Sequence, residues 1–440
     1  MIAKAINTSF EKIRVFQRKL YRAAKAAPER KFGVLYDKVY RKDVLWYAWS
    51  MVKANAGAPG VDRQTIREIE EAGIDVLLND LQKKLEAKRY KPKPVRRVYI
   101  PKANGKQRPL GIPTVVDRIV QAAVKIVIEP IFEADFKDFS YGFRPKRNAH
   151  MALREIYKYL NFGCQWVVDA DLKAYFDTIP QDKLMITLRQ RITDKAILKL
   201  IELWLKAGVM EGMEVRKQLT GTPQGGVISP LLANIYLHWL DKIWVKRGYN
   251  ARNHNAHMVR YADDFVILCR KNPEFYLQQA KGVLNKLDLT LNEDKTRIVN
   301  ATEGFDFLGH HFVVEPSKLT GKLKSYYYPS GKAQKVIRAK IKEIVRHGQH
   351  KDLPELINKE INPVLRGWGN YFKTGNARKI FLKIDNYVTY VLTIMLRKKH
   401  KKRSKGWREH PPSWYYGYQQ LFSLNKLLVG IDGNTRYERN

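Results

Sequence analysis

The clearest pattern along the chain is a set of short apolar runs, rich in β-branched residues, that end in polar turns. Val95–Pro101 and Gln107–Ile112 are predicted as two strands joined by a turn at 103–106. Residues 259–268 are predicted as a hairpin with a tight turn at its centre, and residues 166–177 as a further, acidic strand. These runs predict antiparallel sheet in the middle of the chain.

Helical spacing of apolar residues dominates elsewhere. Ile119, Val120, Ala123, Val124, Val127, Ile128 and Ile131 form the stripe of a core-facing helix. Three helical stretches, about 332–347, 353–373 and 376–402, predict a small bundle that forms a separate domain. Residues 1–50 are predicted as a basic helical extension, for which packing on the main body and direct RNA contact are equally open.

The composition of the chain indicates which class of partner it binds. At 440 residues the chain is expected to form two or three domains, and its 81 Lys and Arg against 43 Asp and Glu give a net charge of +38. Such an excess indicates a polyanion, and we favour nucleic acid over a membrane because no apolar run approaches the roughly 20 residues that span a bilayer. Cys164 and Cys269 are interpreted as buried thiols in a reducing compartment.

The acidic strands carry the candidate chemistry. Asp263 and Asp264 are adjacent at the predicted turn, where their carboxylates repel, and a divalent cation such as Mg²⁺ would offset that repulsion. Asp169 and Asp171 share one face of the earlier strand. Acidic residues on a single strand more often lie exposed at the edge of a sheet than form a metal site. If the two strands are neighbours, however, Asp171 and Asp263 can share two Mg²⁺ ions about 3.5–4 Å apart. This pairing leads to the hypothesis of a nucleic-acid polymerase.

Basic and glycine-rich segments surround these strands. Residues 83–108 hold 11 basic side chains and one acid, so Lys102 and Arg108 could hold a triphosphate, although a solvated charged hairpin is as good an interpretation of this segment alone. The loop 221–230 contains two adjacent glycines that let the backbone approach a ligand. The loop 139–145 suits stacking and backbone contact with nucleic acid, and equally a packed turn. Residues 397–408 have eight Lys or Arg and are followed by a run of aromatic residues. This pattern favours a nucleic-acid-binding segment over a disordered basic tail.

Taken in order, Tyr141-Gly142-Phe143-Arg144-Pro145, Asp171 to Asp177, Pro223-Gln224-Gly225-Gly226 with Ser229-Pro230, and Tyr261-Ala262-Asp263-Asp264 resemble the motifs of bacterial group II intron reverse transcriptases. The resemblance runs from about residue 10 to the end, and Val364–Phe372 resembles the maturase signature of the thumb. It implies an α+β right-hand polymerase, with fingers and palm built on antiparallel sheet, an α-helical thumb and a small basic C-terminal domain. The implied domains are 1–50, 51–320, 321–395 and 396–440.

The resemblance also assigns site residues by position. It implies that Asp171, Asp263 and Asp264 bind two Mg²⁺ ions, with the Leu172 carbonyl as an extra ligand. It implies nucleotide contacts by Lys102, Arg108, Tyr175, Gln224 and Lys295, with Tyr175 as the aromatic gate against the 2′-hydroxyl and Lys295 as a proton donor to pyrophosphate. It implies template or RNA contacts by Gly60, Asp62, Arg144, Arg366, Lys399 and Lys402.

The expected activity is RNA-directed DNA synthesis together with help in splicing and mobility of the parent intron. The expected partners are group II intron RNA, an RNA template with a DNA or RNA primer, target DNA and deoxynucleotides, with no membrane partner and an open oligomeric state. The expected location is the bacterial cytoplasm at the nucleoid, with an organelle as the alternative. The family's DNA endonuclease module is missing, so a primer such as a nascent strand at a replication fork is expected.

Three rival functions stay open. One is a maturase without polymerase activity, which the intact carboxylates argue against. Another is an RNA-dependent RNA polymerase, against which Tyr175 argues, and which a comparison of deoxynucleotide with ribonucleotide incorporation would decide. The last is a diversity-generating or defence-associated reverse transcriptase, which Gly225-Gly226 with Ser229-Pro230 and the maturase-like thumb disfavour.

Overall fold

A computed structural model describes residues 2–101, 105, 107–211, 214–216, 220–222, 225–251, 254–401 and 409–429. The chain folds into two compact units, each made of three segments. Unit 1 comprises Met1–Ala152, Val168–Ile267 and Asn272–Arg297. Unit 2 comprises Leu153–Val167, Leu268–Lys271 and Ile298–Asn440.

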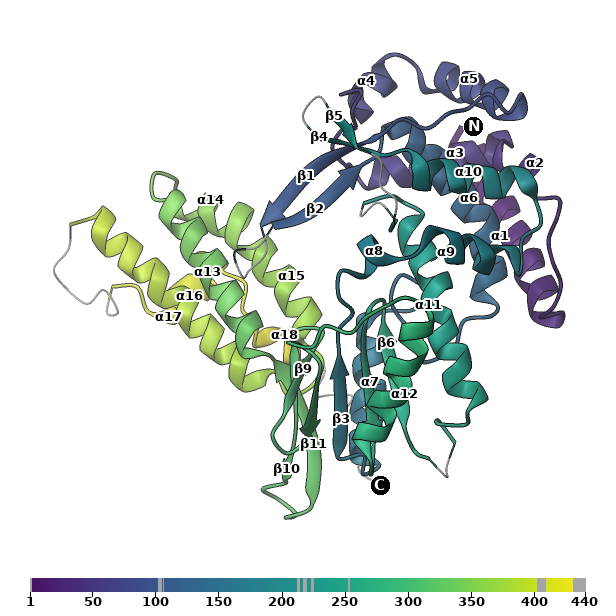
Figure 1. The fold of residues 1–440 in the computed structure, drawn as a ribbon. Helices are drawn as coiled ribbons and strands as arrows, with labels where there is room; N and C mark the ends of the chain where they lie inside the picture. The colour runs from purple at the N-terminus through teal and green to yellow at the C-terminus, as the bar shows by residue number, and fades with distance from the viewer. Residues whose placement is uncertain are drawn as a thin grey trace. The chain divides into compact units, whose positions relative to one another are not determined.

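Helices make up most of unit 1 (Figure 1). They are α1 (Ile2–Ala26), α2 (Tyr36–Val39), α3 (Lys42–Ala54), α4 (Ile66–Glu71), α5 (Ile74–Glu86), α6 (Val115–Glu133), α8 (Tyr175–Thr178), α9 (Gln181–Arg189), α10 (Lys195–Lys206), α11 (Ser229–Lys246) and α12 (Pro273–Lys286). A further helix, α7 (Ala149–Asn161), begins in unit 1 and ends in unit 2.

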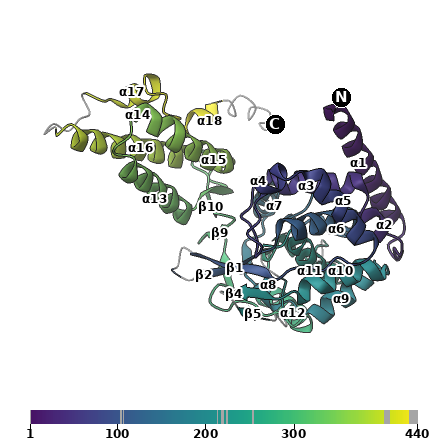
Figure 2. The same ribbon diagram turned by 90° about the horizontal axis from the view of Figure 1, so that it is seen from above.

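The centre of unit 1 is α6, as its apolar stripe predicted. Its residues from Ile119 to Ile131 are almost all buried, and α1 and α3 pack against it (Figure 2). The helix begins where the sequence provides a cap: Thr114 accepts a hydrogen bond from the Asp117 amide. In the same way Asp194 caps α10 by accepting from the amides of Ala196 and Ile197.

Three sheets complete the fold. The first has the order β2-β1-β4-β5, with β1 (Val95–Pro101), β2 (Gln107–Ile112), β4 (Val209–Glu211) and β5 (Glu214–Arg216). The second has the order β11-β10-β9, with β9 (Phe305–Phe307), β10 (His310–Pro316) and β11 (Leu323–Pro329). The third has the order β6-β7-β3-β8, with β3 (Trp166–Ala170), β6 (His257–Tyr261), β7 (Asp264–Cys269) and β8 (Arg297–Asn300).

The sequence predicted the β1–β2 hairpin to the residue, and the two strands pair antiparallel from Arg96↔Ile112 to Pro101↔Gln107. It did not predict that β1 also pairs with β4, in parallel. The prediction of free, buried Cys164 and Cys269 is confirmed. None of the helices in the described part of the chain combines the length and apolar character needed to cross a bilayer.

Unit 2 contains the predicted helical bundle around one apolar core (Figure 1). Its helices are α13 (Gly331–His347), α14 (Leu353–Glu355), the π-helix η1 (Leu356–Ile361), α15 (Asn362–Phe372), α16 (Arg378–Lys399), α17 (Pro412–Gly417) and α18 (Lys426–Val429). The single stretch predicted over 353–373 is therefore divided in three. Pro363, in the first turn of α15, lacks the amide that a continuous helix would need at that position.

Candidate active site

The two acidic strands are neighbours, as the sequence predicted. In the third sheet β7 lies beside β3, Asp171 directly follows β3, and Asp264 is the first residue of β7. The carboxyl groups of Asp264 and Asp171 are close enough to interact directly, and Asp263 is close enough to both to interact through its charge. Unit 1 thus brings three carboxyl groups from two distant segments to one place.

The crowding of these groups changes their acidity. Burial, and then the charge of Asp171, raises the pKa of Asp263, while Arg108 and Lys295 act in the opposite direction. Desolvation by the surrounding protein, and then the charge of Asp263, raises the pKa of Asp264 to about 7, even though its side chain retains access to solvent. Both shifts run in the direction that a divalent cation would reverse, because burial and neighbouring carboxyl groups oppose ionisation of these side chains.

The ammonium group of Lys295 contacts the cluster. Lys295 Nζ lies 2.6 Å from Asp171 Oδ2, and the Asn292 side-chain amide lies 3.4 Å from the same oxygen. Backbone pairing brings this segment in: the Asn292 amide donates to the Asp171 carbonyl, and the Lys173 amide donates to the carbonyl of Thr290. The predicted ligand Leu172 sits within this pairing, where it is buried and bridges to Leu291.

The donor set fits a hard divalent cation, because it consists of three carboxylates with uncompensated charge and no soft ligand. Across the residues that the structure describes, no group of three or more His, Cys, Asp or Glu side chains is already arranged as a metal site. The ammonium of Lys295 occupies one oxygen of Asp171. An entering cation would therefore take the place of Lys295 at that oxygen.

The β1–β2 hairpin contributes Arg108, whose charge acts on Asp263. Gly225, at φ +111°, approaches the same hairpin so closely that a Cβ there would lie 2.6 Å from the Gly111 carbonyl oxygen. This close approach gives the predicted glycine loop a structural reason. Lys102 and Gln224, the other predicted nucleotide contacts, lie outside the described residues.

Tyr175 lies in the core of unit 1. Its ring is buried, with 3% of the residue exposed, and its hydroxyl donates to the Ala233 carbonyl at 2.6 Å. The side chain thus forms part of the core between α8 and α11. Its expected contact with the nucleotide sugar stays a prediction.

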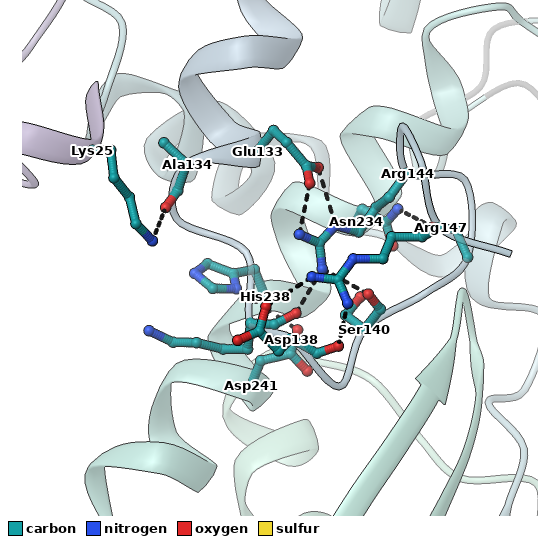
Figure 3. A network of polar contacts seen from close by, with 12 residues as sticks. Lys25, Glu133, Ala134, Asp138, Ser140, Arg144, Arg147, Asn234, His238 and Asp241 are labelled. Atoms are coloured by element: carbon teal, nitrogen blue, oxygen red, sulfur yellow. Dashed lines mark hydrogen bonds and ion pairs between the residues drawn. The ribbon is translucent and has the colours of Figure 1, made fainter. Parts of the chain in front are cut away.

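Arg144 is likewise directed into the protein (Figure 3). Its guanidinium bonds both carboxylate oxygens of Glu133, at 2.7 and 3.0 Å, and the carbonyls of Lys137 and Ser140. With 3% of its side chain exposed, Arg144 has no surface to offer a phosphate. These contacts favour the packed-turn interpretation, in which Arg144 fixes the loop 139–145, and an RNA contact by Arg144 stays a prediction.

The loop around Gly60 and Asp62 is also held from within. A Cβ on Gly60 would lie 2.6 Å from the Thr114 backbone, so this glycine allows tight packing beside α6. Arg96 donates to the Pro59 carbonyl, and Arg118 donates to that of Ala58. The carboxylate of Asp62 lies 3.6 Å from the ammonium of Lys93. Any template contact by this loop remains a prediction.

The remaining predicted RNA contacts lie in unit 2. Arg366 is exposed on α15, with its guanidinium 5.3 Å from the centre of the Phe422 ring. Lys399, in the last turn of α16, is exposed and donates to the Lys351 carbonyl. Lys402 lies outside the described residues. The exposed positions of Arg366 and Lys399 leave their side chains accessible to a phosphate backbone.

The sequence analysis missed three polar residues behind the acidic turn: Arg260, Asp241 and Asn234. Arg260 and Asp241 are fully buried, and Asn234 is 2% exposed. A signal did exist, because Asp241 and Asn234 are polar residues on the apolar side of α11. A charge in such a position requires a buried partner.

Acidic residues on adjacent strands, a basic hairpin and a helical bundle together define a template-directed nucleic-acid polymerase. Residues 100–312 match the family model described as reverse transcriptase (RNA-dependent DNA polymerase), and residues 334–412 match the maturase-specific domain of group II introns. Neither matched domain is an endonuclease.

Individual relatives of the chain agree with these two family matches. The chain is 38% identical to protein YkfC of Escherichia coli over 339 residues, which is 69% of this chain and 88% of that protein. It is 34% identical over 359 residues to the group II intron-encoded protein LtrA of Lactococcus lactis, covering 67% of this chain but 59% of LtrA. The chain belongs to the group II intron reverse transcriptase and maturase family.

Among solved structures, a partial Cas6–RT–Cas1–Cas2 complex is similar with a TM-score of 0.34 and 22% identity, over 57% of this chain and 42% of that chain. Reverse transcriptases generally use divalent metal ions, and the two matched domains imply nucleic-acid partners.

Proposed function

We propose that this protein copies RNA into DNA for a group II intron, and that it assists the splicing and mobility of that intron as a maturase. The observation that carries the proposal is the clustering of Asp171, Asp263 and Asp264, which are close enough for their carboxyl groups to act on one another. These carboxylates fall within the segment that matches reverse transcriptases.

The proposed reaction is attack of a primer 3′-hydroxyl on the α-phosphate of a deoxynucleotide. Two Mg²⁺ ions held by Asp171, Asp263 and Asp264, with the Leu172 carbonyl as an additional ligand, would lower the pKa of that hydroxyl and neutralise charge on pyrophosphate. The contact of Lys295 with Asp171 supports a role for Lys295 as proton donor to the leaving group. The effect of the Arg108 charge on Asp263 supports a role for Arg108 in binding the triphosphate.

The proposed partners follow from charge and from the two domains. A net charge of +38 supports binding of a polyanion, here group II intron RNA, an RNA template with its primer, and target DNA. The exposed side chains of Arg366 and Lys399 are candidates for backbone contacts. The proposed place of action is the bacterial cytoplasm at the nucleoid.

Primer extension on an RNA template with deoxynucleotides and Mg²⁺ tests the proposal. Asp263→Asn keeps the shape of the side chain and removes its charge, so we expect synthesis to be lost while RNA affinity, which basic surfaces provide, is kept. Asp169→Asn is the matched control, because Asp169 is an acid on the neighbouring strand β3 that pairs with Arg297 instead, at 3.3 Å. Undiminished extension by Asp263→Asn would refute the assignment.

The maturase part has a separate test. Splicing of the intron RNA that surrounds this reading frame should be stimulated by the protein and by Asp263→Asn alike, because steadying folded RNA does not need the carboxylate. Loss of stimulation in Asp263→Asn alone would contradict this separation of roles.

A further inference from the structure

The turn that presents the acidic residues has an unusual backbone. It joins β6 to β7 through Ala262 and Asp263, and Ala262 is in the left-handed region at φ +59°. This conformation is unfavourable for a residue with a Cβ, so the surrounding structure must hold it. The question is which groups do so.

One support is the backbone of the 139–145 loop. Ser140 bridges to Arg260 beside the turn, and the Tyr141 amide donates to the Arg260 carbonyl at 2.8 Å. At Gly142 the two chains come so close that a Cβ would lie 2.3 Å from the amide nitrogen of Ala262. A side chain of any size at position 142 would therefore displace the turn.

The other support is the side chain of Arg260. Its Nη1 donates to the carbonyl of Ala262 at 2.9 Å, and to the side-chain oxygen of Asn234 at 3.1 Å. Its Nε and Nη2 donate to the two carboxylate oxygens of Asp241, at 3.0 and 2.5 Å. One guanidinium thus ties the backbone of the turn to two residues of α11.

The contacts among α11, the loop 139–145 and the turn form a closed network. The Asn234 side-chain amide donates to the Gly142 carbonyl at 2.7 Å, so α11 holds both the loop and, through Arg260, the turn that packs on it. Figure 3 shows Asn234, His238 and Asp241 gathered on this side of α11, and His238 Nδ1 lies 3.7 Å from Asp241. Burial acts to raise the pKa of Asp241, but the charge of Arg260 prevails and lowers it, so the pair is ionised.

Stability alone does not account for this pair. A buried ion pair costs much desolvation, and a well-packed apolar pair of similar volume is often as stable. What an apolar pair cannot do is bond the Ala262 carbonyl, a carboxylate and an amide from one planar group. The geometry therefore favours a role in placing the turn.

We propose that Arg260 is a positioning residue whose guanidinium holds the turn that presents Asp263 and Asp264, an inference that rests on the proposed polymerase function. Arg260 itself does not need to touch the substrate. It acts by keeping the two carboxylates in register with Asp171, and a misplacement of about 1 Å in such a constellation can cost on the order of 100-fold in rate.

Arg260→Lys tests the proposal, because an ammonium keeps the charge but cannot make all these bonds at once. We expect kcat for deoxynucleotide addition to fall about 100-fold, the Mg²⁺ concentration for half-maximal rate to rise, and the Kd for RNA to stay unchanged. Arg191→Lys is the matched control. Arg191 is also buried and bonds Asp135 and several backbone carbonyls of unit 1, but none in the turn. It should lose thermal stability and keep kcat.

A readout without catalysis separates this proposal from the proposed function. Hydrogen–deuterium exchange in a peptide covering 257–269 should be faster in Arg260→Lys and unchanged in Arg191→Lys, whether or not the protein copies RNA. If Arg260→Lys fails to fold, Asn234→Ala is used in its place, because it removes the bonds of Asn234 to Arg260 and to the Gly142 carbonyl. It should show the same changes to a smaller degree. Wild-type exchange and wild-type kcat in the folded variant would overturn the proposal, whereas an inactive unmodified protein would instead refute the polymerase assignment.

Discussion

Asp171 holds the site together at the scale of single residues. Its carboxyl group interacts with that of Asp264 and accepts a hydrogen bond from Lys295, and its backbone pairs with the segment that carries Lys295. Because the Lys295 side chain is 62% exposed, this ion pair contributes only about 0–1 kcal/mol. Lys295 therefore offers weak competition to a divalent ion at Asp171, and remains close by when displaced.

Tyr175 provides the sharpest prediction about a single residue. Tyr175→Ala removes a buried ring and the hydrogen bond to Ala233, so the free energy of unfolding should fall by about 3–5 kcal/mol. If the ring also crowds the nucleotide sugar, as the resemblance implies, the folded variant should incorporate ribonucleotides more readily. Urea denaturation and competitive incorporation measure the two effects. A folded variant that still rejects ribonucleotides would contradict the gate assignment.

The charged residues that the sequence singled out have a local signature. Asp263 and Asp264 are adjacent acids at a turn between apolar strands, and Lys295 follows a short polar segment. The burial of Tyr175 was not predicted, and that of Arg144 was one of two open interpretations, because the direction of a side chain depends on the local turn, which a motif does not specify. Arg260 was missed because its partners on α11 are distant in sequence and follow no periodic pattern.

At the scale of secondary-structure elements, the β1–β2 hairpin matters most for the candidate site, because it carries Arg108. Its register pairs Arg108 with Ile100 and Arg97 with Gly111, so Arg108 and Arg97 lie on opposite faces of the hairpin. The charge of Arg108 acts on Asp263. The element thus presents one basic face to the carboxylates, with Gly225 packed against its backbone.

Arg108→Ala should raise the KM for deoxynucleotides about 10- to 100-fold, the value of a hydrogen bond to a charged group. Arg97→Ala should leave KM unchanged and serves as the control from the other face. Steady-state primer extension at varied deoxynucleotide concentration decides between them. Equal effects of the two substitutions would show that the hairpin acts through its general charge.

Local pattern was sufficient to predict these strands because their alternation, Gly-containing turn and flanking prolines agree. The parallel pairing of β1 with β4 could not be predicted from the sequence, because it joins segments more than a hundred residues apart and depends on how the helices between them pack. The division of 353–373 into three helices was also missed, although Pro363 was visible in the sequence. The proposed domain boundaries remain predictions.

At the scale of the whole molecule, the charge of +38 is the dominant property. Spread over exposed lysines and arginines, it gives a sequence-independent affinity for polyanions that depends on released counterions. The carboxylate cluster is the local exception, since it places uncompensated negative charge within a basic protein.

RNA affinity should therefore fall by about 10³-fold or more when salt is raised from about 50 to about 200 mM, if six or more phosphates are neutralised. Fluorescence anisotropy with a labelled RNA measures this dependence. Asp263→Asn should show the same slope as the unmodified protein, because a carboxylate does not neutralise phosphates. A Kd insensitive to salt would indicate that specific contacts, and not charge, carry the binding.

The most direct measurement is an anomalous difference map from crystals of the protein grown with Mn²⁺, a strong anomalous scatterer that accepts the same oxygen ligands as Mg²⁺. The account predicts a peak in contact with carboxylate oxygens of both Asp171 and Asp263, with the Lys295 ammonium moved away from Asp171. Peaks elsewhere on the molecule, with none shared by these two carboxylates, would contradict it.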